Sequence, residues 1–261
     1  MLGQVVADEL LDLLAERVGP LDAGDRLHEG LDDLVSALVR HADDAHLLTR
    51  EMGDRFHEGD TILDFAGPLG EPSEIEDYGT VICIGGGLGI APLYPIARDL
   101  KAAGNTLIGI LGARNQELLF YEDKMAAVCD ELHVMTDDGS NGNKGFVSDP
   151  LREILASGRE IERVWAIGPA IMMKVCCTVT REFGVPTIVS LNSVMIDGTG
   201  MCGGCRVDVG GVAKFACVDG PEFDGHQVNF DLLMSRQGYY AHEEACSLEL
   251  YLSEAEEGAA T

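Results

Sequence analysis

Three cysteines and one aspartate in the last third of the chain have the spacing of an iron–sulfur binding loop. Asp197, Cys202, Cys205 and Cys217 follow the pattern D-x4-C-x2-C-x11-C. A plant-type [2Fe–2S] loop reads C-x4-C-x2-C with a more distant fourth cysteine, so an aspartate takes the first ligand position here. The glycines between these residues allow the positive φ angles that a loop wrapping a cluster needs. We therefore expect these four residues to be metal ligands.

A zinc site is the alternative for this loop, because C-x2-C pairs also occur in zinc knuckles. The loop lacks a second C-x2-C pair or a histidine pair, and its first ligand would be a carboxylate. The spacing therefore favours iron–sulfur over zinc. Four other cysteines lie in apolar, strand-like or helix-like runs and are expected to be small buried side chains. They are Cys83, Cys129, Cys176 and Cys177.

Residues 79–192 alternate between short apolar runs and helical patterns. This alternation predicts an α/β fold with a five-stranded, doubly wound parallel sheet. The expected strands are Val81–Ile84, Thr106–Leu111, Leu132–Met135, Val164–Ile167 and Thr187–Leu191. The expected helices are Ile90–Ala103, Gln116–Val128, Val147–Ala156 and Ala170–Phe183. Ligands bind at the carboxyl ends of the strands in such sheets, so these ends are where a site is expected.

Four strand ends carry residues suited to a nucleotide. The glycine-rich turn after the first strand opens a helix, whose N-terminal N–H groups favour a phosphate. Arg114 follows the second strand as a cation. The carboxylates of Asp137 and Asp138, after the third strand, would bind ribose hydroxyls and repel a 2′-phosphate, which favours NADH over NADPH. The expected nucleotide-binding residues are Gly85, Gly86, Gly87, Gly89, Ala91, Pro92, Arg114, Asp137, Asp138, Gly168, Pro169 and Met172.

Each of these positions taken alone also fits a simpler role. The glycines suit close packing, the charged residues suit a solvated surface, and a methionine in a helix is commonly part of a core. Four suitable strand ends in one sheet are a stronger signal than any single one. Together they predict a dinucleotide site.

The composition excludes several classes of partner. The chain has 18 basic and 45 acidic residues, a net charge of −27, which argues against nucleic acid or an anionic membrane as a partner. It has no apolar run long enough to cross a bilayer and no signal-peptide pattern at its N-terminus. We therefore expect a cytoplasmic protein.

The rest of the chain carries weaker patterns. Apolar spacing predicts helices at Val5–Val18 and Leu31–Val39, and a short strand before Gly70. A hairpin is expected from Arg206–Val209 and Ala213–Ala216 around a Gly-Gly turn. The acidic tail, residues 241–261, is expected to fray.

With these motifs in view, the chain from about Thr49 to Tyr240 resembles the small-subunit family of NADH-dependent reduced ferredoxin:NADP oxidoreductases, also called sulfide dehydrogenases. This family is a branch of the ferredoxin reductase-like flavoproteins. The resemblance rests on seven motifs: Gly67-Pro-Leu-Gly-Glu-Pro-Ser73, Gly85–Pro95, Gly112-Ala-Arg-Asn115, Thr136-Asp-Asp-Gly-Ser140, Ile167–Lys174, Asp197–Val207 and Cys217–His226.

The resemblance implies a three-part electron-transfer subunit. Residues 49–78 would be a remnant of an FAD-binding barrel, 79–192 an NAD(P)-binding domain, and 193–240 a small [2Fe–2S] domain. Gly67, Pro68, Leu69 and Gly70 would bind cofactor where the chain leaves the barrel. Electrons would pass between NAD(P)H, FAD and the cluster, and no side chain would act as a catalytic acid or base. The implied partners are a larger flavoprotein subunit with [4Fe–4S] clusters and ferredoxin.

The front of the chain departs from the family pattern. Residues 1–48 have a helical character and no flavin motif, and the barrel is too short to be complete. We hypothesise that this segment comes from a shifted reading frame or a replaced N-terminus, so that the chain binds FAD poorly. Two alternatives follow. The chain is a non-catalytic module that binds nucleotide and cluster, or it is an electron transfer subunit of dihydroorotate dehydrogenase. Asp197 disfavours the second alternative, because that branch keeps four cysteine ligands.

Overall fold

The computed structural model describes residues 69–259, with side chains up to residue 251. The described residues fall into two compact units, one ending at Met234 and the other beginning at Ser235. The helices predicted within residues 1–48, and the strand predicted before Gly70, lie outside the described residues. Those expectations remain predictions.

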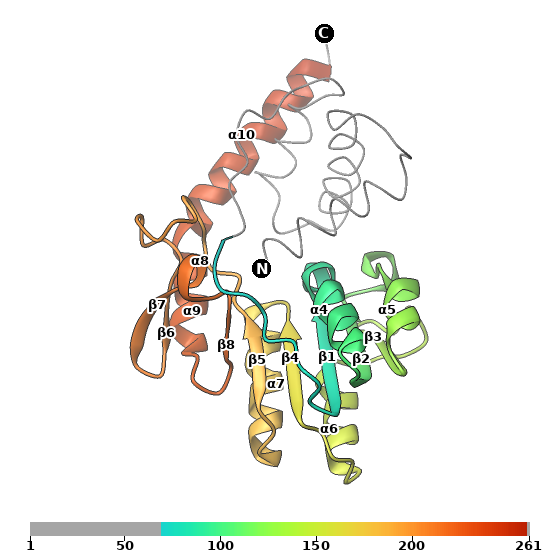
Figure 1. Ribbon diagram of the computed structural model, residues 1–261. Helices are drawn as coiled ribbons and strands as arrows, with labels where there is room; N and C mark the ends of the chain where they lie inside the picture. Colours follow the sequence, from blue (N-terminus) through green and yellow to red (C-terminus); the bar gives the residue numbers. More distant parts are fainter. Residues whose placement is uncertain (1–68, 260–261) are drawn as a thin grey trace, which may run out of the picture. The chain divides into compact units, whose positions relative to one another are not determined.

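The first unit is built on a six-stranded sheet with the order β3-β2-β1-β4-β5-β8 (Figure 1). Its parallel strands match the five predicted ones, which confirms the doubly wound α/β fold. They are β1 (Thr80–Gly86), β2 (Thr106–Ala113), β3 (Glu131–Thr136), β4 (Arg163–Ile167) and β5 (Thr187–Ser190). From β1 the chain moves outward to β2 and β3, and then returns to place β4 and β5 on the other side of β1. The ends of β1 and β4 therefore flank the point where strand order reverses, where ligands bind in such sheets.

Alternate residues of each strand pack on opposite faces of the sheet. In β1, Val81 and Cys83 pack with residues of α4 and α5, whereas Ile82 and Ile84 pack with residues of α6 and α7. Because both of their faces are buried, the central strands β1 and β2 are apolar along most of their length rather than alternating. The covering helices are α4 (Ile90–Ala102), α5 (Glu122–Val128), α6 (Ser148–Ala156) and α7 (Ala170–Phe183).

The single helix predicted from Gln116 to Val128 is wrong, because the chain breaks between a short 3₁₀ turn, η2 (Gln116–Leu118), and α5. The Asn115 side chain accepts a hydrogen bond from Leu118 N at 3.1 Å, and the Asn115 carbonyl accepts from the same N–H at 3.3 Å, which closes the first turn. Tyr121 then adopts a left-handed conformation with φ 59°. Its ring packs edge-on against two other aromatic rings, those of Tyr94 and Phe120. Aromatic packing therefore outweighs the helical pattern here.

The segment that follows the cluster loop completes the sheet. Its predicted hairpin is confirmed as β6 (Arg206–Val209) and β7 (Val212–Phe215), followed by a short helix, α8 (Ala216–Asp219). A further strand, β8 (Glu222–Asp224), pairs antiparallel with β5. This sixth strand was not predicted, because three residues are too few to carry an alternating pattern. Phe223 of β8 lies in the same buried cluster as Met173 of α7, so the sheet and the cluster segment share one core.

The chain ends in helical elements. Helix α9 (Phe230–Gln237) is followed by η3 (Gly238–Tyr240) and α10 (Ala241–Ala259). The prediction that the acidic tail frays was wrong as far as Ala259. Its alanines, leucines and glutamates are strong helix formers, and Glu243 and Glu244 lie in the first turn, where carboxylates favour a helix. Within residues 69–259, no helix has both the length and the apolar character needed to cross a bilayer.

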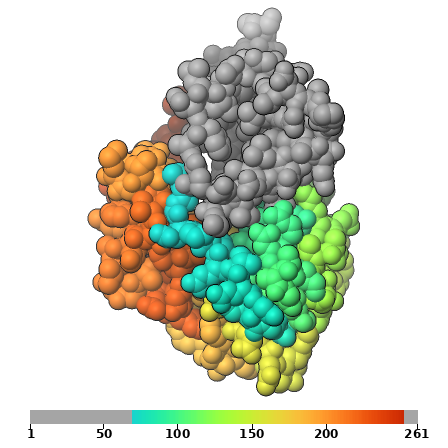
Figure 2. Space-filling view, in the orientation of Figure 1, coloured from blue at the N-terminus to red at the C-terminus, as the bar shows by residue number. Residues whose placement is uncertain are grey.

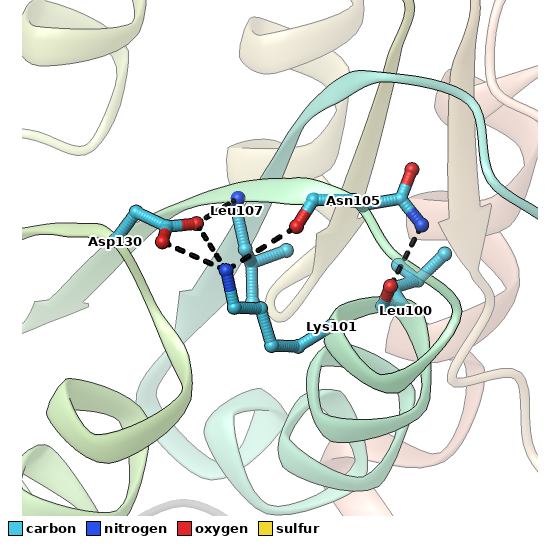
Figure 3. Close-up of polar contacts among 5 residues, drawn as sticks. All are labelled: Leu100, Lys101, Asn105, Leu107 and Asp130. Carbon is cyan, nitrogen blue, oxygen red and sulfur yellow. Dashed lines mark hydrogen bonds and ion pairs between the residues drawn. The ribbon is translucent and has the colours of Figure 1, made fainter.

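A buried asparagine links the segments that lie at the amino-terminal ends of the central strands. Asn105 is 1% exposed, and its amide group joins three separate stretches of chain. Its Nδ2 donates to the carbonyls of Leu100 (2.7 Å) and Glu76 (2.8 Å), and its Oδ1 accepts from Tyr78 N at 2.8 Å. Figure 3 shows Asn105 beside an ion pair, in which both carboxylate oxygens of Asp130 lie 2.7 Å from Lys101 Nζ. The connector that precedes β1, residues 69–79, is thereby held to the end of α4.

We predict that Asn105→Ala lowers the free energy of unfolding by about 1–3 kcal/mol, because buried backbone groups of Leu100, Glu76 and Tyr78 lose their partner. Denaturant titration measures this difference. Asn143→Ala is the control, because Val134 O, which accepts from the Asn143 amide, also accepts from Asn141. The control should stay within about 0.5 kcal/mol of wild type. Equal losses in the two variants would contradict the role given to Asn105.

Candidate nucleotide and iron–sulfur site

The glycines at the end of β1 and in the turn that follows it divide into two groups. A Cβ atom on Gly89 would lie 2.3 Å from Ile167 O, and one on Gly86 would lie 2.3 Å from Met172 Sδ. These glycines, with Gly85, permit close packing against neighbouring segments. Gly87 differs, because it has φ +53° and an added Cβ would meet no atom within 4 Å. It lies in η1 (Gly87–Gly89), directly before α4, and so leaves open space at a helix N-terminus.

The carboxyl ends of β1 and β4 pack against each other and against Met172. A Cβ on Gly168 would lie 2.8 Å from Met172 Cε and 3.0 Å from Gly86 O. Met172 therefore lies between the two strand ends and packs on both. Pro169 is exposed at the start of α7, and Ala91 and Pro92 are partly exposed in the first turn of α4. The predicted residues of these two strand ends do lie together.

The residues after β2 and β3 also lie side by side. Asp137 N donates to Ala113 O at 3.1 Å, and Asp138 N donates to Arg114 O at 3.2 Å. The Asp138 carboxylate accepts from Ser140 N at 2.9 Å, and hydrogen bonds from Ser140 hold the pKa of that carboxyl below its ordinary value. Burial raises the pKa of Asp137, Arg114 lowers it, and Asp138 raises it. The Asp138 carboxylate is thus occupied by a hydrogen bond within its own turn. The Asp137 carboxylate instead interacts electrostatically with Arg114.

Sequence reasoning missed one side chain at this edge. Phe146 is 63% exposed and directly follows Gly145, whose N–H donates to Thr136 O at the end of β3. The next residue, Val147, packs on Gly112 near the end of β2. An exposed aromatic ring on the turn that follows β3 offers a flat surface on which a base can stack. The signal in the sequence was an aromatic residue within a glycine- and asparagine-rich turn, where packing does not require one.

Two of the four predicted metal ligands meet in the core. The Sγ atoms of Cys205 and Cys217 lie 3.1 Å apart as free thiols, and the two residues are only 1% and 4% exposed. Burial, and then the neighbouring Cys205 thiol, raise the pKa of Cys217 to about 11. Because cysteine binds a metal as the thiolate, binding of a metal by these two residues releases their protons.

The other two predicted ligands lie on the surface of the same loop. Cys202 is exposed, and its N–H donates to Asp197 Oδ2 at 2.7 Å, while Thr199 N donates to Asp197 Oδ1 at 2.8 Å. These backbone donors hold the pKa of Asp197 below its ordinary value. The structure therefore does not bring all four together: within residues 69–259, no three His, Cys, Asp or Glu side chains are grouped to hold a metal ion.

The residues of this loop nevertheless fit an iron–sulfur group. Gly198, Gly200 and Gly203 have φ between 68° and 84°, so the chain curls back with its N–H groups inward. The two buried thiols in contact supply soft ligands, and Cys202 is an exposed thiol on the same loop. The Asp197 carboxylate would have to exchange at least one backbone hydrogen bond for the metal.

The cofactor turn predicted at residues 67–70 lies directly against the cluster loop. Gly67 and Pro68 are outside the described residues, but the next two positions are described. A Cβ on Gly198 would lie 2.7 Å from Leu69 Cδ1, and one on Gly70 would lie 2.2 Å from Gly220 O. Glu71 N donates to Gly220 O at 2.7 Å. Figure 2 shows this stretch, in cyan, against the orange surface of the cluster segment.

Comparisons with known proteins match the two segments of the chain that carry these residues. Residues 83–178 match the model of an oxidoreductase NAD-binding domain, and residues 192–229 match that of the iron–sulfur cluster binding domain of dihydroorotate dehydrogenase B. A relative from Thermotoga maritima is named a homologue of the dihydroorotate dehydrogenase B (NAD(+)) electron transfer subunit. It is 54% identical over 242 residues, which cover 93% of this chain and 83% of the relative. The chain belongs to this electron transfer subunit family.

Other relatives of this family agree. A probable electron transfer subunit from Methanocaldococcus jannaschii is 36% identical over 174 residues, covering 66% of this chain and 65% of that protein. The solved structure of an NADH-dependent reduced ferredoxin-NADP oxidoreductase, described for flavin-based electron bifurcation, is 52% identical. It has a TM-score of 0.71 and covers 79% of this chain and 74% of that one. The resemblance inferred from the motifs is thereby confirmed. The Thermotoga alignment covers so much of the chain that it extends into residues 1–48.

We predict that Gly87→Ala raises the Kd for NADH at least about tenfold, or about 1.4 kcal/mol, because the added methyl group occupies the open space at the start of α4. Gly184→Ala is the matched control, since Gly184 also has a left-handed φ (+69°) and open space around it, but lies at the far end of α7. Both substitutions carry a similar backbone cost, about 1–2 kcal/mol. Titration of NADH by fluorescence compares them, and equal Kd values would remove Gly87 from the site.

Proposed function

We propose that this subunit carries electrons between NADH, bound at the ends of β1–β4, a flavin beside residues 67–70, and a [2Fe–2S] cluster held by Asp197, Cys202, Cys205 and Cys217. The observation that carries this proposal is the direct contact of Leu69 and Gly70 with the cluster loop. When bound, the flavin would exchange a hydride with NADH and single electrons with the cluster. The protein supplies the binding, the orientation and the exclusion of water.

Different residues of this site bind different parts of the nucleotide. The open space at Gly87 and the N–H groups that follow it receive a phosphate. Arg114 adds a cation, Asp137 accepts from ribose hydroxyls, and Phe146 gives the base a surface for stacking. Met172 packs against the ends of both β1 and β4 and forms the apolar base of the site. Gly168 and Pro169, at the switch point of the sheet, would then hold the nicotinamide.

The partner is proposed to be a larger flavoprotein subunit with [4Fe–4S] clusters, with ferredoxin as a further electron partner. Support comes from the ferredoxin-NADP oxidoreductase structure at 52% identity. A second candidate is a dihydroorotate-oxidising subunit, which the names of several relatives favour. Co-purification from the source cells, followed by assay with dihydroorotate and with ferredoxin, separates the two.

An anaerobic inventory of flavin, iron and sulfide, followed by addition of NADH, tests the core proposal. We expect about two iron and two sulfide ions per chain, and bleaching of the cluster absorbance by NADH only when flavin is bound. Iron and sulfide without flavin, and no reduction of a dye by NADH even after flavin is added, would instead support a non-catalytic binding module.

We predict that Cys205→Ser or Cys217→Ser abolishes the visible absorbance of the reconstituted protein, because each removes a buried thiolate ligand. Cys246→Ser, at an exposed cysteine of α10, is the control and should keep the full spectrum. Asp197→Cys should retain a cluster and lower its reduction potential, because a thiolate donates more electron density than a carboxylate. A potential unchanged by Asp197→Cys in voltammetry would count against Asp197 as a ligand.

We predict that Asp137→Ser shifts the preference from NADH towards NADPH by about tenfold in kcat/KM, which corresponds to about 1.4 kcal/mol. The reason is that the Asp137 carboxylate accepts from ribose hydroxyls and repels a 2′-phosphate beside Arg114. Asp138→Ser is the comparison, since its carboxylate is bound to Ser140 N. A larger shift from Asp138→Ser would reverse the two roles. The assay is steady-state dye reduction with each nucleotide.

A further inference from the structure

A single turn of helix carries the last of the four cluster ligands. Helix α8 has only four residues, Ala216–Asp219, and Cys217 is the second of them. One turn of helix is costly to form by itself, because it fixes several backbone dihedrals for a single hydrogen bond. The direction in which the Cys217 side chain points therefore depends on contacts that hold this turn in place.

The Asp219 carboxylate closes the turn. Its Oδ2 accepts a hydrogen bond of 2.7 Å from the backbone N–H of Phe215, the residue that directly precedes α8. A carboxylate that reaches back in this way satisfies a donor that the helix itself leaves without a partner, as in a capping box. The other oxygen, Oδ1, lies 3.6 Å from Lys214 Nζ on β7. Asp219 thus ties the last residue of the turn to the strand that leads into it.

The closed turn brings Cys217 against the rest of the ligand loop. Ala216 N donates to Cys205 O at 3.1 Å, and Cys217 N donates to Cys205 Sγ at 3.5 Å. On the other side of the ligand, Val218 packs on the loop, since a Cβ on Gly200 would lie 2.8 Å from Val218 Cγ2. The residues before and after Cys217 therefore both touch the loop that carries the other three ligands.

We propose that Asp219 is a positioning residue for the cluster, which closes α8 and so holds the Cys217 sulfur in place beside Cys205. Asp219 is not itself a ligand in this assignment. It acts through the hydrogen bond to Phe215 N, in the way that groups around a metal site orient the ligands. The inference deepens the proposed function and rests on the ligand set named there.

The role requires the oxygen acceptor of Asp219 rather than its charge. Both partners of the ion pair with Lys214 are partly exposed, and such pairs contribute little. An asparagine at this position keeps an oxygen that can accept from Phe215 N, whereas an alanine has none. Asp219→Asn and Asp219→Ala therefore separate the hydrogen bond from the charge.

Loss of the reconstituted cluster to an iron chelator tests the role. Asp219→Ala should lose its visible absorbance at least about tenfold faster than wild type, because removal of a group that orients a metal ligand typically weakens metal binding about 10–100-fold. Asp219→Asn should lose it at close to the wild-type rate. Equal rates in wild type and Asp219→Ala would overturn the proposal, and so would equally fast loss in the Asn and Ala variants.

Asp224→Ala is the matched control. The Asp224 carboxylate also accepts from a backbone N–H of the same segment, that of His226 at 3.0 Å, but this turn carries no cluster ligand. The control should lose its cluster at the wild-type rate. The electron paramagnetic resonance spectrum of the reduced cluster is a second readout. Its g values should shift in Asp219→Ala, where the Cys217 sulfur is displaced, and stay unchanged in Asp219→Asn and Asp224→Ala; an unshifted spectrum in Asp219→Ala would contradict the proposal.

Denaturant unfolding of the metal-free variants distinguishes positioning from a general loss of stability. Asp219→Ala and Asp224→Ala should unfold at similar denaturant concentrations, since each loses a carboxylate that accepts from a backbone N–H. If Asp219→Ala fails to fold, or unfolds far earlier than the control, its role is structural and the proposal is overturned. A wild type that takes up no iron and sulfide would contradict the ligand set of the proposed function itself, whereas an equally stable cluster in every variant would contradict only the role of Asp219.

Discussion

The hydrogen bond from Glu71 N to Gly220 O, beside the antiparallel pairing of β8 with β5, is the constraint on which the rest of the site depends. It joins the stretch that enters the sheet to the stretch that leaves the cluster loop. Gly70 is required there, because a side chain would collide with the Gly220 carbonyl. The nucleotide edge and the thiol pair are therefore parts of one packed unit, and their separation is fixed by backbone contacts.

Most of the fold was predictable from the sequence because its strands are buried on both faces. Continuous apolar runs such as Val81–Ile84 are unusual outside a parallel sheet, and glycines at their ends mark where strands stop. The pairing of β8 was not predictable, since its three residues are too few to carry an alternating pattern. The break at Tyr121 was also hidden. It depends on aromatic contacts with Tyr94, a residue on another helix, and no local pattern carries that information.

For the candidate site, the sequence indicates which strand ends carry suitable residues, but it does not indicate which contacts each residue makes. The spacing of Asp137 and Asp138 gave them equal standing, but only the structure separates the carboxylate that closes a turn from the one that faces Arg114. In the same way, four glycines after β1 looked alike in the sequence, and three of them prove to be packing contacts. Phe146 was missed because a single exposed aromatic has no periodicity.

The β5–β8 pairing also bears on how such proteins are assembled in evolution. If the chain were cut after residue 192, β5 would become an exposed edge with unpaired N–H and C=O groups, and Phe223 would leave a gap beside α7. The two halves are therefore not interchangeable cassettes. A lineage that replaced the cluster segment with another electron carrier would have to supply a new edge strand at the same time, so the nucleotide fold and the redox loop are inherited together.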